Sequence, residues 1–168
     1  MKHKAITMLE IGLRHDPFYD RSNRISPSLS MWTDYFQHAK IVGFDINDFT
    51  GMTKGRVLVM QGDQGDAGDL QRLANRVGPL DIIIDDGSHA SWHQQFTLRS
   101  LFRHLRPGGL YIIEDLHARP EALEATLPES PTLDVLLKEP DFIRSLGIAA
   151  ADVSLEKEGR LAIIRRTF

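Results

Sequence analysis

The segment LDIIIDDGSH, residues 80–89, is the most informative part of this chain about its fold class. Three consecutive isoleucines lie between Asp81 and Asp85, with no alternation of polar and apolar residues. A strand of this kind is typical of the middle of a parallel sheet, where helices cover both faces. Gly87 and several polar residues, including His89, follow the apolar run at once. We therefore predict a central strand that ends at Asp85.

Four other short runs rich in apolar and β-branched residues lie on either side of this strand along the chain: Ala5–Ile11, Ile41–Asp45, Arg56–Gln61 and Gly109–Glu114. Between them, two sets of apolar residues have the i, i+3, i+4, i+7 spacing of a helix face: Leu70, Leu73, Ala74 and Val77, and Leu98, Leu101, Phe102 and Leu105. The pairs or triplets GP at 78–79 and PGG at 107–109 are expected to end these helices. The alternation of strands and helices predicts βαβ units and a parallel sheet.

The C-terminal part of the chain has a different pattern. A helix is expected between Pro131 and Leu146, with an interruption at Pro140. Two short runs, Val153–Glu156 and Leu161–Arg165, flank a turn with a glycine and predict an antiparallel hairpin. We expect a single α/β domain over residues 1–168, with a mostly parallel sheet that ends in this hairpin.

The composition excludes several classes of protein. The chain has 168 residues, no cysteine and a formal net charge of −3. Without cysteine there is no disulfide scaffold, Cys-ligated zinc site or thiol nucleophile. The slightly acidic balance argues against a broad nucleic-acid surface, and no run of about 18 apolar residues predicts a membrane span. The apolar segment Ala5–Leu9 is too short for a signal peptide, so we expect a cytoplasmic protein without nucleic-acid or membrane partners.

Every predicted parallel strand ends in or next to a carboxylate. In an open α/β sheet, ligands bind beyond the carboxyl ends of the strands. The polar residues and glycine at these ends are Glu10, Gly12, Asp45, Asp63, Gln64, Asp85, Asp86, His89, Glu114 and Asp115. We expect one ligand site at this edge of the sheet; the alternative is that the acids only solvate the strand ends.

The loop after the first strand differs from a dinucleotide-binding motif. Gly12 is followed by Leu13, Arg14 and His15, so the G-x-G-x-x-G pattern that holds a pyrophosphate is absent. NAD and FAD are therefore disfavoured, whereas a nucleoside without phosphates fits. Asp45 can accept hydrogen bonds from both ribose hydroxyls, as the corresponding acid does for NAD. Alternatively, Asp45 caps the loop that follows it.

Asp86, Glu114 and Asp115 form a second candidate cluster, because the fourth and fifth strands are expected to be neighbours. Carboxylates crowded in one crevice raise one another's pKa unless a cation compensates. All-oxygen ligation suits Mg²⁺, Mn²⁺ or Ca²⁺. His89 is a candidate general base, because histidine titrates near neutral pH. The alternative is an exposed acidic rim that binds no metal.

Two segments of the sequence resemble those of the metal-dependent O-methyltransferases that modify antibiotic sugars, the mycinamicin and tylosin type. They are DIIIDDGSH at 81–89 and PGGLYIIED at 107–115, and more generic matches include LEIG at 9–12 and QGDQ at 61–64. The resemblance extends from about Leu9 to His117. It implies a Rossmann-like class I methyltransferase sandwich that transfers a methyl group from S-adenosylmethionine to a hydroxyl of a small molecule, a sugar or glycosylated natural product.

The resemblance also implies roles for individual residues. Asp86, Glu114 and Asp115 would be ligands of Mg²⁺ or Mn²⁺, and His89 would be the catalytic base. The residues that it implies around S-adenosylmethionine are Glu10, Gly12, Asp45, Asp63, Gln64 and Asp85.

Two other functions stay open on the sequence alone. One is an enzyme of the same fold that catalyses an isomerisation or a cyclisation, and the other is a non-enzymatic ligand-binding module. The acceptor pocket is expected to be open, or completed by Leu13–Pro27, by the stretch after His117 or by a second subunit of a homo-oligomer.

Overall fold

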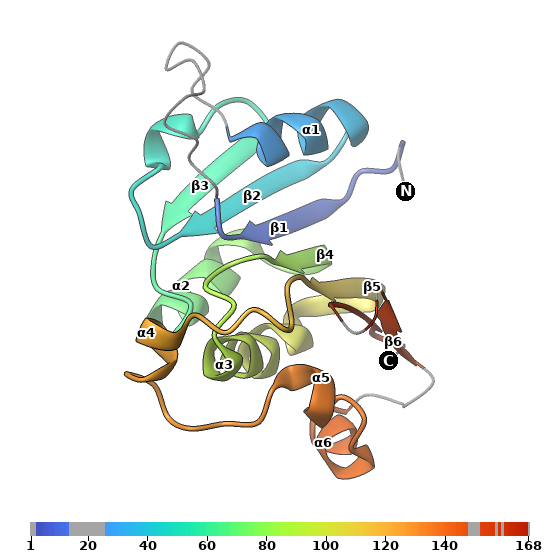
Figure 1. Ribbon diagram of the computed structural model, residues 1–168. Coiled ribbons are helices and arrows are strands. Elements are labelled where there is room, and N and C mark those ends of the chain that lie inside the picture. The colour runs from blue at the N-terminus through green and yellow to red at the C-terminus, as the bar shows by residue number, and fades with distance from the viewer. Residues whose placement is uncertain (1–2, 14–25, 148–151, 157, 159, 168) are drawn as a thin grey trace.

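The computed structural model describes residues 3–13, 26–147, 152–156, 158 and 160–167. They contain a seven-stranded sheet with the order β3-β2-β1-β4-β5-β7-β6 (Figure 1). The strands are β1 (Thr7–Ile11), β2 (Lys40–Asp45), β3 (Val57–Gln61), β4 (Leu80–Asp85), β5 (Leu105–Ile113), β6 (Val153–Glu156) and β7 (Leu161–Arg165). The first five run parallel, and β7 pairs antiparallel with both β5 and β6. This confirms the predicted sheet and its terminal hairpin.

β4 lies in the middle of the sheet, between β1 and β5. Ile83 is buried in the core on one face, and Ile82 and Ile84 are buried in the core on the other. Because side chains alternate between the two faces along a strand, three consecutive isoleucines are all buried only where both faces are covered. The uninterrupted apolar run thus predicts the central strand correctly.

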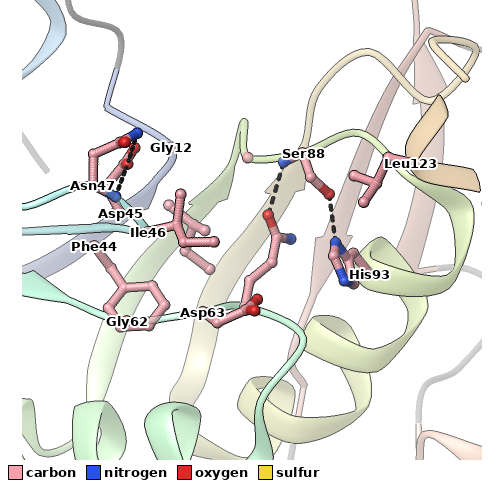
Figure 2. A pocket seen from close by; sticks show the side chains of 13 residues that line it. Gly12, Phe44, Asp45, Ile46, Asn47, Gly62, Asp63, Ser88, His93 and Leu123 are labelled. Atoms are coloured by element: carbon pink, nitrogen blue, oxygen red, sulfur yellow. Dashed lines mark hydrogen bonds between the residues drawn. The ribbon is translucent and has the colours of Figure 1, made fainter. Parts of the chain in front are cut away.

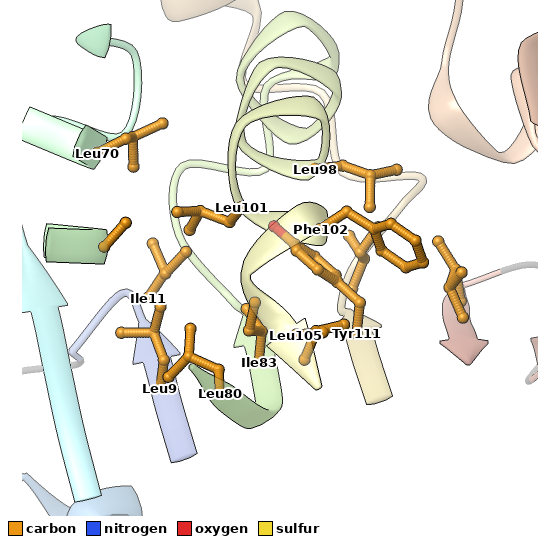
Figure 3. Packing of buried hydrophobic residues seen from close by; sticks show 14 of the residues in the cluster. Leu9, Ile11, Leu70, Leu80, Ile83, Leu98, Leu101, Phe102, Leu105 and Tyr111 are labelled. Carbon is orange, nitrogen blue, oxygen red and sulfur yellow. The ribbon is translucent and has the colours of Figure 1, made fainter. Parts of the chain in front are cut away.

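Helices cover both faces of the sheet. α2 (Ala67–Val77) and α3 (Ser91–Leu101) lie on one face, where Leu70 and Leu98 pack in the core with residues of β1 and β4 (Figures 1 and 3). α1 (Pro27–Tyr35) lies on the other face. The apolar stripe predicted for α2 is the surface that this helix buries. Of the stripe predicted for α3, only Leu98 and Leu101 lie in the helix, because Phe102 belongs to a following 3₁₀ turn and Leu105 begins β5. Burial of such a stripe supplies most of the stability of a short helix.

The two predicted helix ends have different outcomes. α2 ends at Gly78, whose φ of 76° suits glycine, as predicted. The prediction that PGG at 107–109 ends α3 is wrong. A 3₁₀ turn, η2 (Phe102–His104), follows α3 directly, and β5 begins at Leu105, earlier than predicted. The β4–β5 pairing shifts register near its start, so an irregularity in β5 accommodates the proline and glycines.

The remaining elements are short: η1 (Thr50–Met52), α4 (Glu121–Glu124), α5 (Leu133–Leu136) and α6 (Pro140–Ser145). α5 and α6 together occupy the region predicted as one helix, and the break falls before Pro140 as expected. Neither α1 nor α4 was predicted, because α1 buries only Leu29 and α4 buries no residue. Such helices leave no apolar stripe in the sequence. Nowhere in the described ranges is a helix long and apolar enough to cross a membrane.

Candidate active site

Two pockets lie side by side at the carboxyl ends of the parallel strands. The first, here called the β2–β3 pocket, has a volume of about 380 Å³; among its lining residues are Gly12, Asp45, Asp63, Gln64, Gly87, His93 and Leu123 (Figure 2). The second, the β4–β5 pocket, also measures about 380 Å³; it is lined by Gly12, Leu13, Asp45, Asp86, Gly87, His89 and Asp115. Because Gly12, Asp45 and Gly87 line both, the two pockets are contiguous.

Gly12 forms part of the wall between the pockets. Its φ is 86°, and a Cβ at this position would lie 2.1 Å from the carbonyl oxygen of Asp86. Its N–H donates to the carbonyl of Phe44 at 2.9 Å, and the N–H of Asp86 donates to the carbonyl of Ile11 at 3.0 Å. Only glycine fits this close approach of the β1 and β4 loops. Of the predicted closing segment Leu13–Pro27, residues 14–25 lie outside the described residues.

Asp45 lies at the end of β2 and lines both pockets. One carboxylate oxygen accepts from the N–H of Leu13 at 2.7 Å, and the other accepts from the backbone and side-chain nitrogens of Asn47 at 2.8 and 2.9 Å. The carboxylate thus caps the following loop, which was the alternative interpretation of this residue. A carboxylate has about four acceptor positions, so these three bonds still leave capacity for a ligand hydroxyl.

Asp63 and Gln64, just after β3, line the β2–β3 pocket. Asp63 accepts from the N–H of Gly65 at 2.7 Å, which holds the loop in a tight turn. Gln64 is buried and accepts from the N–H of Ser88 at 2.7 Å, while its amide donates to Asp85 at 3.4 Å. Gln64 therefore connects the loops that follow β3 and β4. Figure 2 shows the position of Ser88 in this pocket.

Asp85 lies below the site rather than at its surface. Its side chain is 1% exposed, lines neither pocket and accepts from the Tyr111 hydroxyl at 3.3 Å. Burial raises the pKa of Asp85 to about 7, although hydrogen bonds from Gly87, Tyr111 and Gln64 favour the ionised form. In this arrangement Asp85 supports the loop after β4 from within the core.

Glu10 and Glu114 lie on the α1 face of the sheet. Glu10 is 4% exposed, and burial raises its pKa to about 7; the charges of Asp86 and Glu114 add to this rise, while the Ser28 hydroxyl opposes it. Leu9 and Ile113 belong to the core on the α2–α3 face. Since side chains alternate along a strand, their successors face the other way, and neither Glu10 nor Glu114 lines the two pockets.

The β4–β5 pocket contains a compact group of possible metal ligands. One ligand atom each from Asp86, His89 and Asp115 lie within 4.8 Å of one another. His89 and Asp115 both have positive φ, at 59° and 50°, which is uncommon outside glycine and often marks functional sites. Nδ1 of His89 is buried and has no hydrogen-bond partner within the described part of the chain. Two carboxylates and an unpartnered imidazole nitrogen fit a divalent cation.

The structure therefore groups Asp86, Asp115 and His89, whereas the carboxylate of Glu114 is not in this group. The backbone of Glu114 is used instead: its N–H donates to the carbonyl of Asp85 at 2.9 Å, and its carbonyl accepts from Gln94 at 3.1 Å. The adjacency of Glu114 and Asp115 in the sequence could not show that only Asp115 belongs to this group.

Ser88, His93 and Leu123 line the β2–β3 pocket but are not among the site residues predicted from the sequence. His93 lies in the first turn of α3 and is 8% exposed, with Nδ1 at 2.8 Å from the Ser88 hydroxyl (Figure 2). Burial lowers the pKa of His93, which favours the neutral ring. Its position four residues after His89, about one helical turn, is a sequence signal that could have placed His93 near the site. Leu123 had none, because only the return of the chain after β5 brings α4 to the pocket.

Glu124 of α4 caps α3 from 33 residues away in sequence, since its carboxylate accepts from the N–H of Ser91 at 2.7 Å. The natural capping position, Ala90, makes no side-chain bond. We therefore expect Glu124→Ala to lower the free energy of unfolding by about 0.5–2 kcal/mol, the usual cost of losing a helix cap. Urea unfolding followed by circular dichroism measures this. Glu121→Ala, which removes an exposed acid from the same helix, is the control, and equal midpoints for the two variants would contradict the capping role.

Comparison with known proteins finds similarity to sugar O-methyltransferases. It is 42% identical over 116 residues to the 8-demethyl-8-(2-methoxy-α-L-rhamnosyl)-tetracenomycin-C 3′-O-methyltransferase of Streptomyces olivaceus, covering 69% of this chain and 29% of that protein. It is 43% identical over 115 residues to the mycinamicin VI 2″-O-methyltransferase of Micromonospora griseorubida, and equally to the demethylmacrocin O-methyltransferase of Streptomyces fradiae; each match covers 68% of this chain and 28% of the relative. No protein-family model matches the chain.

Solved structures extend the likeness to nearly the whole chain. The MycE methyltransferase of the mycinamycin biosynthetic pathway, in complex with Mg and SAH (S-adenosylhomocysteine), superposes with a TM-score of 0.76 at 31% identity, covering 99% of this chain and 46% of that one. Its complex with Mg, SAH and mycinamycin VI gives a TM-score of 0.73. The chain spans less than a third of the curated relatives that it matches. It thus has the class I methyltransferase fold, and over about two thirds of its length it is homologous to the O-methyltransferases that modify sugars of macrolides and other glycosides.

Proposed function

We propose that this chain is a single catalytic domain that transfers a methyl group from S-adenosylmethionine to a sugar hydroxyl of a glycosylated small molecule, with the help of a divalent metal ion. The observation that carries the proposal is the contiguity of the two pockets. Gly12, Asp45 and Gly87 line both, so a nucleoside in the β2–β3 pocket would lie next to the group Asp86, His89 and Asp115. The homologous MycE holds Mg, SAH and mycinamycin VI together.

The β2–β3 pocket is the proposed cofactor site. Its volume of about 380 Å³ is in the range of small-molecule sites. We assign Asp45 to the ribose hydroxyls, Asp63 and Gln64 to the region of the base, and Gly12 to the close backbone approach. S-adenosylmethionine carries no phosphate, so the lack of a pyrophosphate-binding glycine motif does not count against it. Glu10 and Asp85 act from the layer below, since neither lines the pocket.

The β4–β5 pocket is the proposed reaction site. We assign Asp86 and Asp115 to the metal, with Glu114 as a third ligand once its carboxylate leaves the α1 face. Mg²⁺ or Mn²⁺ at this position would stabilise the alkoxide form of the acceptor hydroxyl. His89 takes the proton of that hydroxyl as the oxygen attacks the methyl group of the sulfonium. The transfer is direct, so the lack of cysteine in this chain is no obstacle.

The proposal is tested by following release of S-adenosylhomocysteine with mycinamicin VI and Mg²⁺ as supplied partners. We expect release that requires the protein, the acceptor and the metal together. Calorimetric binding of S-adenosylmethionine without any release across several glycosylated acceptors would favour the non-methylating enzyme instead. If neither S-adenosylmethionine nor Mg²⁺ binds, the result would favour the non-enzymatic ligand-binding module.

Asp45→Ala is expected to weaken binding of S-adenosylmethionine about ten- to a hundredfold. The loss of hydrogen bonds to a partly buried carboxylate costs about 1.5–3 kcal/mol, and each 1.4 kcal/mol is a factor of about ten in affinity. Titration calorimetry gives the dissociation constant. Asp48→Ala removes an exposed acid of the same loop that lines neither pocket and should bind as the wild type does. An unchanged constant in Asp45→Ala would argue against the cofactor site.

A further inference from the structure

A third pocket lies at the opposite end of the sheet from the proposed active site. It has a volume of about 360 Å³ and includes Arg99, Arg103 and Arg166 among its lining residues. Arg99 comes from the end of α3 and Arg103 from η2, which precede β5, and Arg166 follows the last strand, β7. Because β7 runs antiparallel to β5, its end returns to the start of β5. The pocket is therefore at the amino-terminal edge of the parallel strands, away from the carboxyl ends.

The lining of this pocket, here called the arginine pocket, is strongly cationic. Besides the three arginines, the described lining residues are Phe102, Ser145, Leu146 and Gly147, none of which carries a carboxylate. Four other arginines of the described chain, Arg72, Arg106, Arg119 and Arg144, each pair with an acid. In contrast, neither Arg99 nor Arg103 forms an ion pair with any described residue. This concentration of positive charge stands out in a chain with a net charge of −3.

Neutral contacts hold the three guanidinium groups in place. Arg99 lies over the ring of Phe142, 4.8 Å from its centroid. Arg103 donates to the side chain of Gln71 at 3.4 Å, and Arg166 donates to the backbone carbonyls of Arg103, at 2.6 Å, and Leu105. These partners orient the guanidinium groups, and the contacts of Arg99 and Arg103 with Phe142 and Gln71 leave the charge of these two side chains unneutralised.

The positive charges of the arginines also affect the pKa of the nearby His104. Its pKa is lowered by burial first and then by the positive charges of Arg103 and Arg166. The imidazole thus favours its neutral form beside these arginines, which lets it act as a hydrogen-bond acceptor from Arg103 at 3.4 Å.

We propose that the arginine pocket binds the phosphate or pyrophosphate group of a small molecule. Guanidinium groups present planar pairs of N–H donors that match the oxygens of a phosphate. A phosphate carries more negative charge and more acceptor oxygens than a carboxylate, so it gains more from a pocket lined by several arginines. Phe102 and Leu146 supply an apolar wall beside the charges, and the volume is that of a small-molecule site. The site is separate from the proposed catalytic pockets, so it stands independently of the proposed function.

Titration of the full chain with inorganic pyrophosphate by calorimetry tests this proposal. The experiment is run at constant ionic strength with EDTA, so that no metal at Asp86 and Asp115 recruits the anion. We expect one saturable site. Arg103→Gln and Arg99→Gln should each weaken binding about tenfold or more, as for the loss of a charged hydrogen bond. Both side chains are exposed, and thermal unfolding verifies that the variants fold.

Arg165→Gln is the matched control. It removes the same charge from the residue next to Arg166, but Arg165 is not part of the pocket lining; it should bind pyrophosphate as the wild type does. Equal losses of affinity in Arg165→Gln and Arg103→Gln would overturn the proposal, because the effect would then be one of overall charge. Absence of saturable binding to the wild type would overturn it as well. A glutamate hexapeptide that displaces pyrophosphate at equal concentration would also overturn it, in favour of an acidic segment of a partner protein.

Discussion

Replacing His89 with alanine is expected to lower kcat about 10²–10⁴-fold, the usual effect of removing a general base. Binding of S-adenosylmethionine and Mg²⁺ should change little, because a base acts on the acceptor proton only during the transfer. The structure supports this role: His89 lines the β4–β5 pocket, and its buried Nδ1 has no hydrogen-bond partner within the described residues. Steady-state kinetics of S-adenosylhomocysteine release and calorimetry on the same variant separate the two effects.

His93→Ala is the control for this experiment, since His93 is the neighbouring histidine one turn along α3 and is hydrogen-bonded to Ser88. It should lower kcat much less. If His89→Ala keeps most of its turnover, the base is another group. If it loses Mg²⁺ binding together with turnover, His89 is a ligand alongside Asp86 and Asp115, an arrangement that the 4.8 Å grouping of their atoms permits.

Removal of the metal is expected to abolish turnover. EDTA should stop release of S-adenosylhomocysteine, and Mg²⁺ in excess over the chelator should restore it. The reason is that the positive charge of the metal ion stabilises the alkoxide form of the acceptor hydroxyl. Asp86→Asn should lower the affinity for Mg²⁺ and raise the Mg²⁺ concentration needed for half-maximal rate. The expectation rests on the two carboxylates, Asp86 and Asp115, that share the β4–β5 pocket and fit a hard cation.

Asp81→Asn is the matched control for the metal experiment. Asp81 belongs to the same strand as Asp85 but lies at its beginning, where it pairs with Arg106. This variant can lose stability, yet its dependence of rate on Mg²⁺ should be that of the wild type. Full turnover in EDTA would show that the acids of the β4–β5 pocket form only a solvated rim.

Much of the fold could be predicted because its signals are local. The apolar run Ile82–Ile84 belongs to a single strand that is covered on both faces, and the stripe of α2 and the two runs of the hairpin each belong to one element. The failures have the same explanation. α1 and α4 bury one residue and none, so they leave no periodic pattern. The start of β5 at Leu105 depends on pairing with β4, which is far away in the sequence.

The local pattern of the sequence is enough to predict that acids gather at one edge of the sheet, since the carboxyl ends of parallel strands share an edge. It could not determine which of these acids face a ligand. The twofold alternation of a strand sends Glu10 and Glu114 to the α1 face, while the left-handed backbone of Asp115 turns its carboxylate toward Asp86 and His89. Asp85 and Asp86 are adjacent in the chain, yet one is sealed in the core and the other lines a pocket. Burial depends on what packs against each face, and only the tertiary structure brings those surfaces together.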